Sequence, residues 1–435
     1  HTYVAWNWDM GADTPTGFGC VTYTGTGATN DISGMGFSPD LVWLKCRDAV
    51  HDHQLSDTVR GAKKTLFAAS TEAEYTGTTD VLTKFNPDGF TVGATGTGAN
   101  QDTKKFVAWG WDMGDSYSVS ASGSGMSQMI AVSGKKNVSK GQSVVTWTGN
   151  GANGRITHGL SNYAEDGGFL AIVKRRDAAS DSWAVLYGGD PTDYLELNTT
   201  SASTDNGTYW NDNSPTANHF QLASGNANIN ANTATYVAYV FHSVSGYSKI
   251  GTYSGTGSTG NAVTTGFRPA FLLIKRNADE GWQIIDSTRN PLNTATTSLS
   301  PNSSAAERDD LVDVDFTSTG FTLQNTDGSI NASGSTYLYY AVAGGMDAVS
   351  TVNTTGNVDA RVKANPTYGQ SIVQYVGKSG LNNVTYGHGL SSSPEVVITK
   401  RRDGNSDCFF SLNSSITGSY IGGRLNTTSA LSDTN

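Results

Sequence analysis

An all-β fold of tandem, jelly-roll-like antiparallel β-sandwich domains is predicted for this 435-residue chain by three observations. Its apolar residues fall in short runs rich in Val, Ile, Tyr and Phe, which is the composition and length of strands. Gly, Asn, Asp and Ser separate these runs, and Gly alone occurs 51 times. The same strand pattern returns four times along the chain, which is typical of repeated domains.

Composition and charge exclude several other classes of protein. Charged residues make up 15% of the chain, against roughly 25% in an average soluble protein, and 9 Trp, 19 Tyr and 15 Phe argue against disorder. The net charge of −10 argues against nucleic acid as a partner, and no apolar run approaches the roughly 20 residues of a membrane span. Three cysteines form neither a disulfide framework nor a CxxC zinc pair. We expect no cofactor and no metal.

Each repeat contains an apolar strand that ends in basic residues. The four versions read FSPDLVWLKCRD at 37–48, GGFLAIVKRRD at 167–177, FRPAFLLIKRN at 267–277 and SPEVVITKRRD at 393–403. The equivalent lysines are Lys45, Lys174, Lys275 and Lys400. In the first three repeats an apolar closing strand follows, at 105–112, 235–242 and 336–344.

The repeats alternate between two kinds, A and B, with a double period near 230 residues. The A repeats share an Asp-x-x-Arg element, at 57–62 and 286–291, whereas the B repeats share LNTTSA, at 197–202 and 425–430. We expect the end of a preceding truncated repeat at 1–15, domain A1 at 16–114, a linker at 115–142, domain B1 at 143–243, domain A2 at 244–344, a linker at 345–370 and a truncated domain B2 at 371–435.

The two ends of the sequence suggest a piece of a longer chain. Residues 2–9, TYVAWNWD, resemble a closing strand with no repeat before it, and B2 stops without its closing strand. The alternative is a natural terminus with strand exchange between subunits.

Local patterns predict individual elements. In 41–44 both alternating sets of residues are apolar, so this strand should be covered on both faces. In the closing strand Val107, Trp109 and Trp111 share one face. Residues 86–89, Asn-Pro-Asp-Gly, predict a turn with Gly89 at positive φ. Only short stretches such as 61–75 and 303–311 are candidates for helix, and the polar remainder suits an elongated rod of domains.

The combined motif resembles a known repeat family. The patterns PDLVW-K-RD, D-VRGA, F--DGF--G and YVAW-W are similar to β-sandwich repeats of structural proteins of tailed phages, especially marine and cyanobacterial ones. A1 matches best, A2 matches more weakly, and the B domains keep only the basic strand end. The resemblance implies a virion structural protein, either a tail fibre or a capsid decoration. The implied partners are other virion proteins, further copies in a homo-oligomer or symmetric array, and host surface polysaccharide.

The charged motif residues are interpreted as structural. A basic strand end can bind an anionic sugar or phosphate, but its recurrence favours ion pairs that close the strand. The three-residue spacing of Asp-x-x-Arg lets the carboxylate cap a turn while the guanidinium folds back onto it. These structural residues are Lys45, Arg47, Asp48, Asp57, Arg60, Lys174, Arg176, Asp177, Lys275, Asp286, Arg289, Lys400, Arg402 and Asp403.

Loop aromatics are the candidates for ligand binding, because sugar rings stack on exposed aromatic faces. The glycan-stacking candidates are Tyr163, Tyr194, Tyr209, Trp210 and Tyr420, with local packing as the alternative. The acidic run at 309–315 is rich in oxygen ligands of the kind that bind Ca²⁺, but its spacing is not that of an EF-hand. The repeats supply no catalytic constellation, so we do not expect an enzyme.

These observations lead to a predicted function and one alternative. We expect a virion structural protein of a tailed phage, assembled in the host cytoplasm and exposed on the particle surface, with host surface glycans as contacts. The alternative is a carbohydrate-binding adhesin module of a bacterial cell-surface protein, located outside the cell.

Overall fold

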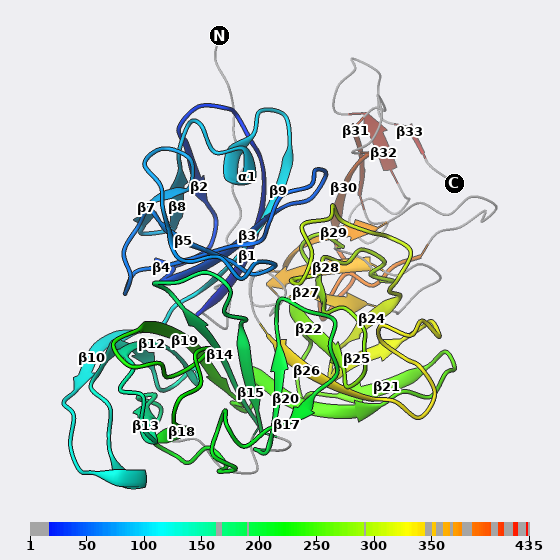
Figure 1. Cartoon of the computed structure of the whole chain (residues 1–435). Helices are drawn as coiled ribbons and strands as arrows, with labels where there is room; N and C mark the ends of the chain where they lie inside the picture. The colour runs from blue at the N-terminus through cyan, green and yellow to red at the C-terminus, as the bar shows by residue number, and fades with distance from the viewer. Residues whose placement is uncertain are drawn as a thin grey trace. The chain divides into compact units, whose positions relative to one another are not determined.

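The chain folds almost entirely into strands (Figure 1). The computed structural model describes residues 17–161, 168–188, 191–290, 293–343, 350–353, 360–365, 369–375, 385–401, 408–412, 421–424 and 432–433. The chain divides into two compact units, Asp13–Ala348 and a second one made of His1–Ala12 with Val349–Asn435. The helical elements of the described residues are α1 (Thr97–Asn100) and one 3₁₀ turn at Gly125–Ser127. The predicted all-β class is therefore confirmed.

A1 is a sandwich of two antiparallel sheets. The larger sheet has the order β1 (Phe18–Thr24), β9 (Lys105–Trp111), β3 (Leu41–Cys46), β4 (Gln54–Asp57), β5 (Lys64–Phe67) and β6 (Tyr75–Thr76). The smaller sheet has the order β2 (Asn30–Ser33), β8 (Gly89–Val92) and β7 (Leu82–Asn86). Strands β7 and β8 meet at the predicted 86–89 turn, and Gly89 has a φ of +151°. A Cβ there would lie 2.0 Å from the Ile32 carbonyl oxygen, so the turn requires glycine.

B1 repeats this arrangement with a wider sheet. Its large sheet has the order β10 (Asp115–Val119), β11 (Val132–Asn137), β12 (Gln142–Thr148), β19 (Thr235–His242), β14 (Phe169–Arg175), β15 (Ala184–Tyr187), β16 (Asp193–Glu196) and β17 (Thr204–Asp205). The small sheet pairs β13 (Gly154–Thr157) with β18 (His219–Leu222). The segment 115–142, expected as a linker, thus supplies β10, β11 and the start of β12.

A2 is the narrowest of the three. Its sheets have the orders β20 (Ser248–Ser254), β26 (Thr336–Val342), β22 (Phe271–Arg276), β23 (Gln283–Asp286), and β21 (Asn261–Thr264), β25 (Gly320–Leu323), β24 (Val314–Thr317). In each domain the closing strand (β9, β19 or β26) lies between the strand that opens the repeat motif (β1, β12 or β20) and the lysine-ended strand (β3, β14 or β22). The register is also shared, because Lys45 pairs with Val107, Lys174 with Val237 and Lys275 with Leu338.

The stretches 61–75 and 303–311, which the sequence offers as candidates for helix, are not helical. Within 61–75 the chain forms β5, and 303–311 is irregular loop. The reason is tertiary, because both stretches carry backbone and side-chain groups that bind a neighbouring domain. The Thr71 and Ser304 carbonyls, for example, accept hydrogen bonds from lysines of other domains.

Alternate residues of the lysine-ended strands face two different cores. Val42 and Leu44 pack with Phe90 inside A1. Leu41 and Trp43 belong instead to a cluster that takes in all three domains, which we call the shared core. Their B1 and A2 equivalents in the shared core are Leu170, Ile172, Phe271 and Leu273. Residues 17–343 are therefore not the expected rod, because each sandwich buries one face against the other two.

The second unit contains two sheets in its described residues. One has β27 (Ser350–Asn353), β28 (Ala360–Asn365) and β29 (Gln370–Tyr375). The other has β30 (Val396–Lys400), β31 (Cys408–Leu412), β32 (Ile421–Arg424) and β33 (Ser432–Asp433). Across all the described residues, no helix is long and apolar enough to span a membrane.

Candidate functional site: the three-domain junction

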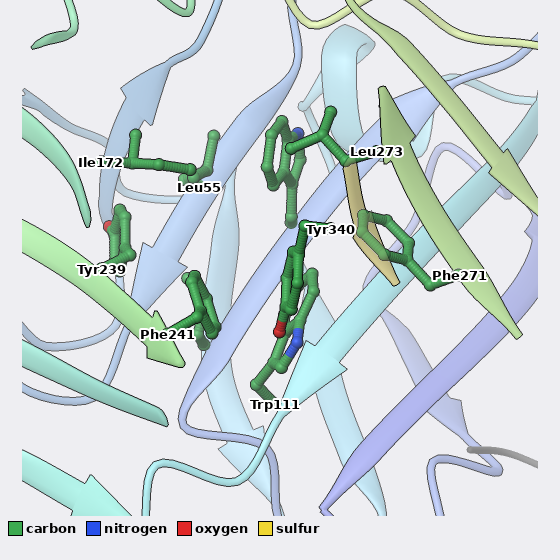
Figure 2. A pocket seen from close by; sticks show the side chains of 10 residues that line it. Leu55, Trp111, Ile172, Tyr239, Phe241, Phe271, Leu273 and Tyr340 are labelled. Atoms are coloured by element: carbon green, nitrogen blue, oxygen red, sulfur yellow. The ribbon is translucent and has the colours of Figure 1, made fainter. Parts of the chain in front are cut away.

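The centre of the junction is apolar and closed. Figure 2 shows side chains from A1, B1 and A2 pointing toward one another around a cavity of about 10 Å³. Its lining consists of Leu41, Trp43, Leu55, Trp111, Ile172, Tyr239, Phe241, Phe271, Leu273 and Tyr340. A space of this size holds at most about one water molecule. The centre of the junction is thus packing, not a ligand pocket.

The lining residues follow a pseudo-threefold pattern. Trp43, Ile172 and Leu273 each lie two residues before the strand lysine. The large residues of the closing strands also correspond, since Trp109, Tyr239 and Tyr340 each lie two residues after the partner of that lysine. Three repeats of one chain therefore contribute equivalent side chains to one core.

Each strand lysine reaches the loop of the next domain around the junction. Lys174 Nζ of B1 donates to the Thr71 carbonyl of A1 at 3.0 Å. Lys275 Nζ of A2 donates to the Thr200 carbonyl of B1 at 3.1 Å. Lys45 Nζ of A1 closes the circle on the Ser304 carbonyl of A2 at 3.2 Å. The recurring lysine is thus a cyclic inter-domain contact, and Thr200 belongs to the LNTTSA element that is specific to B domains.

Burial lowers the pKa of these three lysines. All three side chains are 0% exposed, and burial lowers the pKa of each to about 8. Main-chain carbonyls also accept from them inside their own domains, such as that of Cys46 from Lys45 at 2.8 Å and that of Asp181 from Lys174 at 2.6 Å. These groups are held as hydrogen-bond donors and not as accessible cationic sites.

An aromatic donor accompanies the lysine contact in two interfaces. Trp183 Nε1 of B1 donates to the Phe67 carbonyl of A1 at 2.9 Å, and Trp282 Nε1 of A2 donates to the Glu196 carbonyl of B1 at 2.9 Å. At the corresponding place in A1 stands His53, whose Nδ1 accepts from Trp43 Nε1 at 3.0 Å. Burial, followed by Lys45 and Arg289, lowers the pKa of His53 well below its usual value, so it is neutral.

The Asp-x-x-Arg element of A1 forms a buried ion pair at the interface with B1. Asp57 Oδ1 accepts from the Arg60 backbone N–H at 2.8 Å, and Asp57 Oδ2 accepts from Arg60 Nε at 2.5 Å. The carboxylate caps the turn and the guanidinium folds back onto it, as the spacing predicts. Arg60 also binds Glu74 at 3.1 Å, and Glu74 in turn accepts from Arg176 Nε of B1 at 2.9 Å.

The same network recurs between A2 and A1. Asp286 Oδ1 accepts from the Arg289 N–H at 2.8 Å, and Asp286 Oδ2 accepts from Arg289 Nε at 2.6 Å. Arg289 then binds Glu307 at 2.9 Å, and Glu307 binds Arg47 of A1 at 2.8 Å. Burial opposes the ionised form of Glu307, but Arg47 and Arg289 outweigh it and lower its pKa.

The three interfaces differ in what the closing strand meets. Tyr239 Oη of B1 donates to Asp57 Oδ2 at 2.9 Å, and Trp109 Nε1 of A1 donates to Asp286 Oδ2 at 3.0 Å. Tyr340 of A2 faces B1. In B1 the position equivalent to Asp57 and Asp286 is occupied by Tyr187, so this interface has no carboxylate there. The A–B alternation therefore determines which interfaces contain a buried carboxylate.

The aspartates that follow the basic residues act inside their own domains. Asp48 Oδ1 accepts from the Lys105 N–H at 3.1 Å, and Asp177 Oδ1 accepts from Arg175 Nε at 2.8 Å. Lys400 ends β30 in the second unit. Arg402 and Asp403 lie outside the described residues.

Comparison with known proteins gives a family without an assigned activity. The model described as "Domain of unknown function (DUF7483)" matches residues 13–346 and again 344–435. The chain belongs to this family. No curated protein and no solved structure matches it. The first match of the DUF7483 family covers nearly the same residues as the compact unit Asp13–Ala348. One family unit therefore corresponds to A1, B1 and A2 around their shared core.

Two of the glycan-stacking candidates in this DUF7483 chain are buried. Trp210 is 0% exposed and Tyr209 is 5% exposed, because their loop folds over the core of B1. Tyr194 is half-buried and stacks on Tyr209 with ring centroids 3.7 Å apart. The expectation that Tyr209 and Trp210 are open to a sugar was therefore wrong. Tyr163 and Tyr420 lie outside the described residues.

The acidic run of A2 is occupied by protein groups. Arg308 pairs with Asp310 at 2.8 Å, and Gln324 Nε2 donates to Asp315 Oδ2 at 2.7 Å. In the part of the chain that the structure describes, no three His, Cys, Asp or Glu side chains gather as metal ligands. Neither Cys20 nor Cys46 forms a disulfide bond.

Sequence reasoning missed the two glutamates that link the domains. Glu74 lies 14 residues after Arg60, whereas Glu307 lies 18 residues after Arg289. The unequal spacing hides their equivalence in a repeat alignment. The available signal was their position in the loops after the Asp-x-x-Arg elements, where an acid can reach two arginines.

Proposed function

We propose that this protein is a structural component of a tailed-phage particle, exposed on its surface as part of a fibre or capsid decoration. The proposal rests on what the residues of the phage-like motif do in the structure. Lys45, Arg47, Asp57 and Arg60 all make inter-domain contacts, so the motif that resembles phage structural repeats is one that joins domains into an assembly unit. A motif that served binding or catalysis would instead leave such groups accessible.

The other prominent depression supports the same assignment. This depression has a volume of about 630 Å³, is open to solvent, and is lined mainly by polar residues beside β10 and β11. Lys135 Nζ lies 2.6 Å from Asp40 Oδ1, and Asp112 accepts from the Gly114 N–H and from Asn137. Its charged groups thus hold A1 to the first strands of B1, which favours a structural over an enzymatic role.

Location on the particle tests the proposal. Antibodies raised against the full chain should label the surface of purified native particles in immunogold electron microscopy. Particles that lack the protein by mass spectrometry, together with labelling confined to a bacterial cell surface, would favour the adhesin alternative.

One exposed aromatic supports contact with glycans as a second activity. Tyr75 is 42% exposed, and its hydroxyl donates to Asp80 Oδ2 at 2.5 Å. An open ring beside a fixed carboxylate offers both stacking and hydrogen bonding to a sugar. A glycan array with the full chain should show binding that Tyr75→Ala removes and Asn30→Ala keeps. Equal signals from both variants would exclude this site.

A further inference from the structure

The small sheet of B1 has a polar outer face. Its strands β13 and β18 pair so that Arg155 lies opposite Gln221, and Thr157 lies opposite His219 (Figure 1). The residues that alternate with them along both strands, such as Ile156, belong to the core of B1, so these four side chains point to the other face. Residues opposite each other on paired strands have Cβ atoms about 5 Å apart. The four residues therefore form one cluster, which we call the outer patch of B1.

Arg155 is a partly buried cation that pairs with no carboxylate among the described residues. The buried arginines of the junction, Arg60 and Arg289, each bind two carboxylates. Arg155 Nε is shielded from water and has no hydrogen-bond partner, and the same is true of the Thr157 hydroxyl. Because Nε is the one nitrogen of this guanidinium that is shielded in this way, its terminal nitrogens remain open to a ligand. An anion bound there would offset the unpaired, partly buried charge.

The other polar groups of the outer patch can also donate hydrogen bonds. Burial and the nearby Arg155 lower the pKa of His219, so its ring is neutral at pH 7. Thr216 Oγ1 lies 3.0 Å from His219 Nδ1, and as the donor in this contact it leaves the ring proton on Nε2. Gln221 Oε1 accepts from Asn211 Nδ2 at 3.5 Å, which leaves the Gln221 NH₂ group to donate. A guanidinium, an imidazole N–H and an amide N–H without a carboxylate are a set of groups that suits an oxyanion.

The outer patch is specific to B1 among the three domains. The register of the small sheets places Asp31 of A1 and Ala262 of A2 at the position of Arg155. At the position of His219 both A domains have glycine. The same two strands therefore pair in A1 and A2 without this cation or this imidazole. The fold of the repeat does not require Arg155 and His219, which leaves them available for a function of B1.

We propose that the outer patch of B1 binds a tetrahedral oxyanion, a phosphate or sulfate group, through the terminal nitrogens of Arg155 with His219 and Gln221 as further donors. Such a group occurs both as a free ion and as an ester on a sugar, and the experiment below separates these sources. The inference depends neither on the proposed location on a phage nor on glycan stacking at Tyr75.

Calorimetric titration of the full chain tests the site. Inorganic phosphate and glucose 6-phosphate should both bind, whereas uncharged glucose should not. Tighter binding of glucose 6-phosphate would assign the group to a sugar ester, and equal binding would assign it to the free ion. Arg155→Gln should weaken binding of both anions by at least about tenfold, because it removes charge-assisted hydrogen bonds.

A matched variant controls for the change of charge. Arg308→Gln removes the same charge from an exposed arginine of A2 that pairs with Asp310, and it should bind both anions like the wild type. Equal affinities of the Arg155 and Arg308 variants would overturn the proposal, because binding would then not depend on the outer patch.

Histidine NMR keeps the proposal testable if the Arg155 variant unfolds. In the wild-type chain with isotope-labelled histidine, the ring signal of His219 should move as inorganic phosphate is added. The variant His219→Asn identifies this signal by its loss. The signal of His53, which is 0% exposed in A1, should stay in place. A His219 signal that does not move at millimolar phosphate would refute the site.

Discussion

Trp109 of A1 donates its indole N–H to Asp286 Oδ2 of A2 at 3.0 Å, across the interface between two repeats, and the two residues are 177 positions apart in the sequence. The Arg289 guanidinium lies 5.6 Å from the centroid of the same ring. The indole therefore contacts both members of a buried ion pair and shields it from water. Removing water strengthens the pair and raises the cost of leaving either charge alone.

Neutralising Asp286 should destabilise the three-domain unit. Asp286→Asn leaves the Arg289 guanidinium, 0% exposed, with Glu307 as its remaining carboxylate. We expect a loss of about 3 kcal/mol in the free energy of unfolding, measured by urea denaturation. The exposed pair Arg308–Asp310 provides the control, and Asp310→Asn should leave the urea midpoint unchanged. Equal midpoints for the two variants would contradict a stabilising role for the buried pair.

The closing-strand tyrosines should differ in their sensitivity to loss of the hydroxyl. Tyr239 Oη donates to Asp57 and accepts from Arg60 Nη2, each at 2.9 Å, so Tyr239→Phe leaves two buried charged groups short of a partner. We expect a loss of about 2 kcal/mol, against less than about 1 kcal/mol for Tyr340→Phe, which faces no carboxylate. Thermal unfolding of both variants measures the difference. A larger effect at Tyr340 would show that the B1–A2 interface depends on polar contacts.

The buried lysines predict a gain of stability at alkaline pH. Burial lowers their pKa from 10.5 to about 8, so between these values the unfolded chain binds more protons than the folded chain. The free energy of unfolding from this source therefore rises as pH increases from 8 to 10.5. Urea unfolding at pH 8 and 10 should show the rise. The variant Lys275→Met should show a smaller rise than Lys249→Met, which changes a partly exposed lysine on β20.

His158 predicts a loss of stability in mild acid. Its Nδ1 accepts from the Leu160 N–H at 3.1 Å, and its Nε2 lies 3.1 Å from the Thr216 carbonyl, which together require the neutral ring. Burial lowers its pKa from 6.5 to about 4. Between these values the unfolded chain takes up the proton first, so stability falls as pH drops, by about 1.4 kcal/mol per unit at most. Melting temperatures at pH 7.5 and 5 measure this.

A substitution separates His158 from other acid-sensitive groups. His158→Asn keeps an acceptor near the Leu160 N–H and removes the titration, so its melting temperature should fall less between pH 7.5 and 5 than that of the wild type. The partly buried His219 offers a second comparison through His219→Asn. If the His158 variant keeps the full acid sensitivity, another buried histidine such as His53, whose pKa burial also lowers, becomes the responsible group. The glutamates Glu74 and Glu307 are not responsible, because their lowered pKa values place their loss below pH 4.5.

Local sequence patterns were sufficient for the strands and for the nearest ion pairs. Side chains alternate between the two faces of a strand, and both faces of β3 are apolar, so the sequence required both faces to be buried. Val42 and Leu44 form one face, whereas Leu41 and Trp43 form the other. The Asp57–Arg60 contact spans three residues, so one turn of backbone brings its atoms together. The Gly89 turn was equally local.

The sequence by itself determined that this is an all-β chain of repeated sandwiches with a lysine that recurs at one strand end, because alternation, turns and repeats are properties of neighbouring residues. Only the tertiary structure decided what covers the second face of each sheet, since Arg47 meets Glu307 260 residues away and Arg176 meets Glu74 102 residues away. It also decided that the Tyr209–Trp210 loop turns inward. Such contacts depend on which of several apolar surfaces pack together, and that choice is made by the shape of the whole unit.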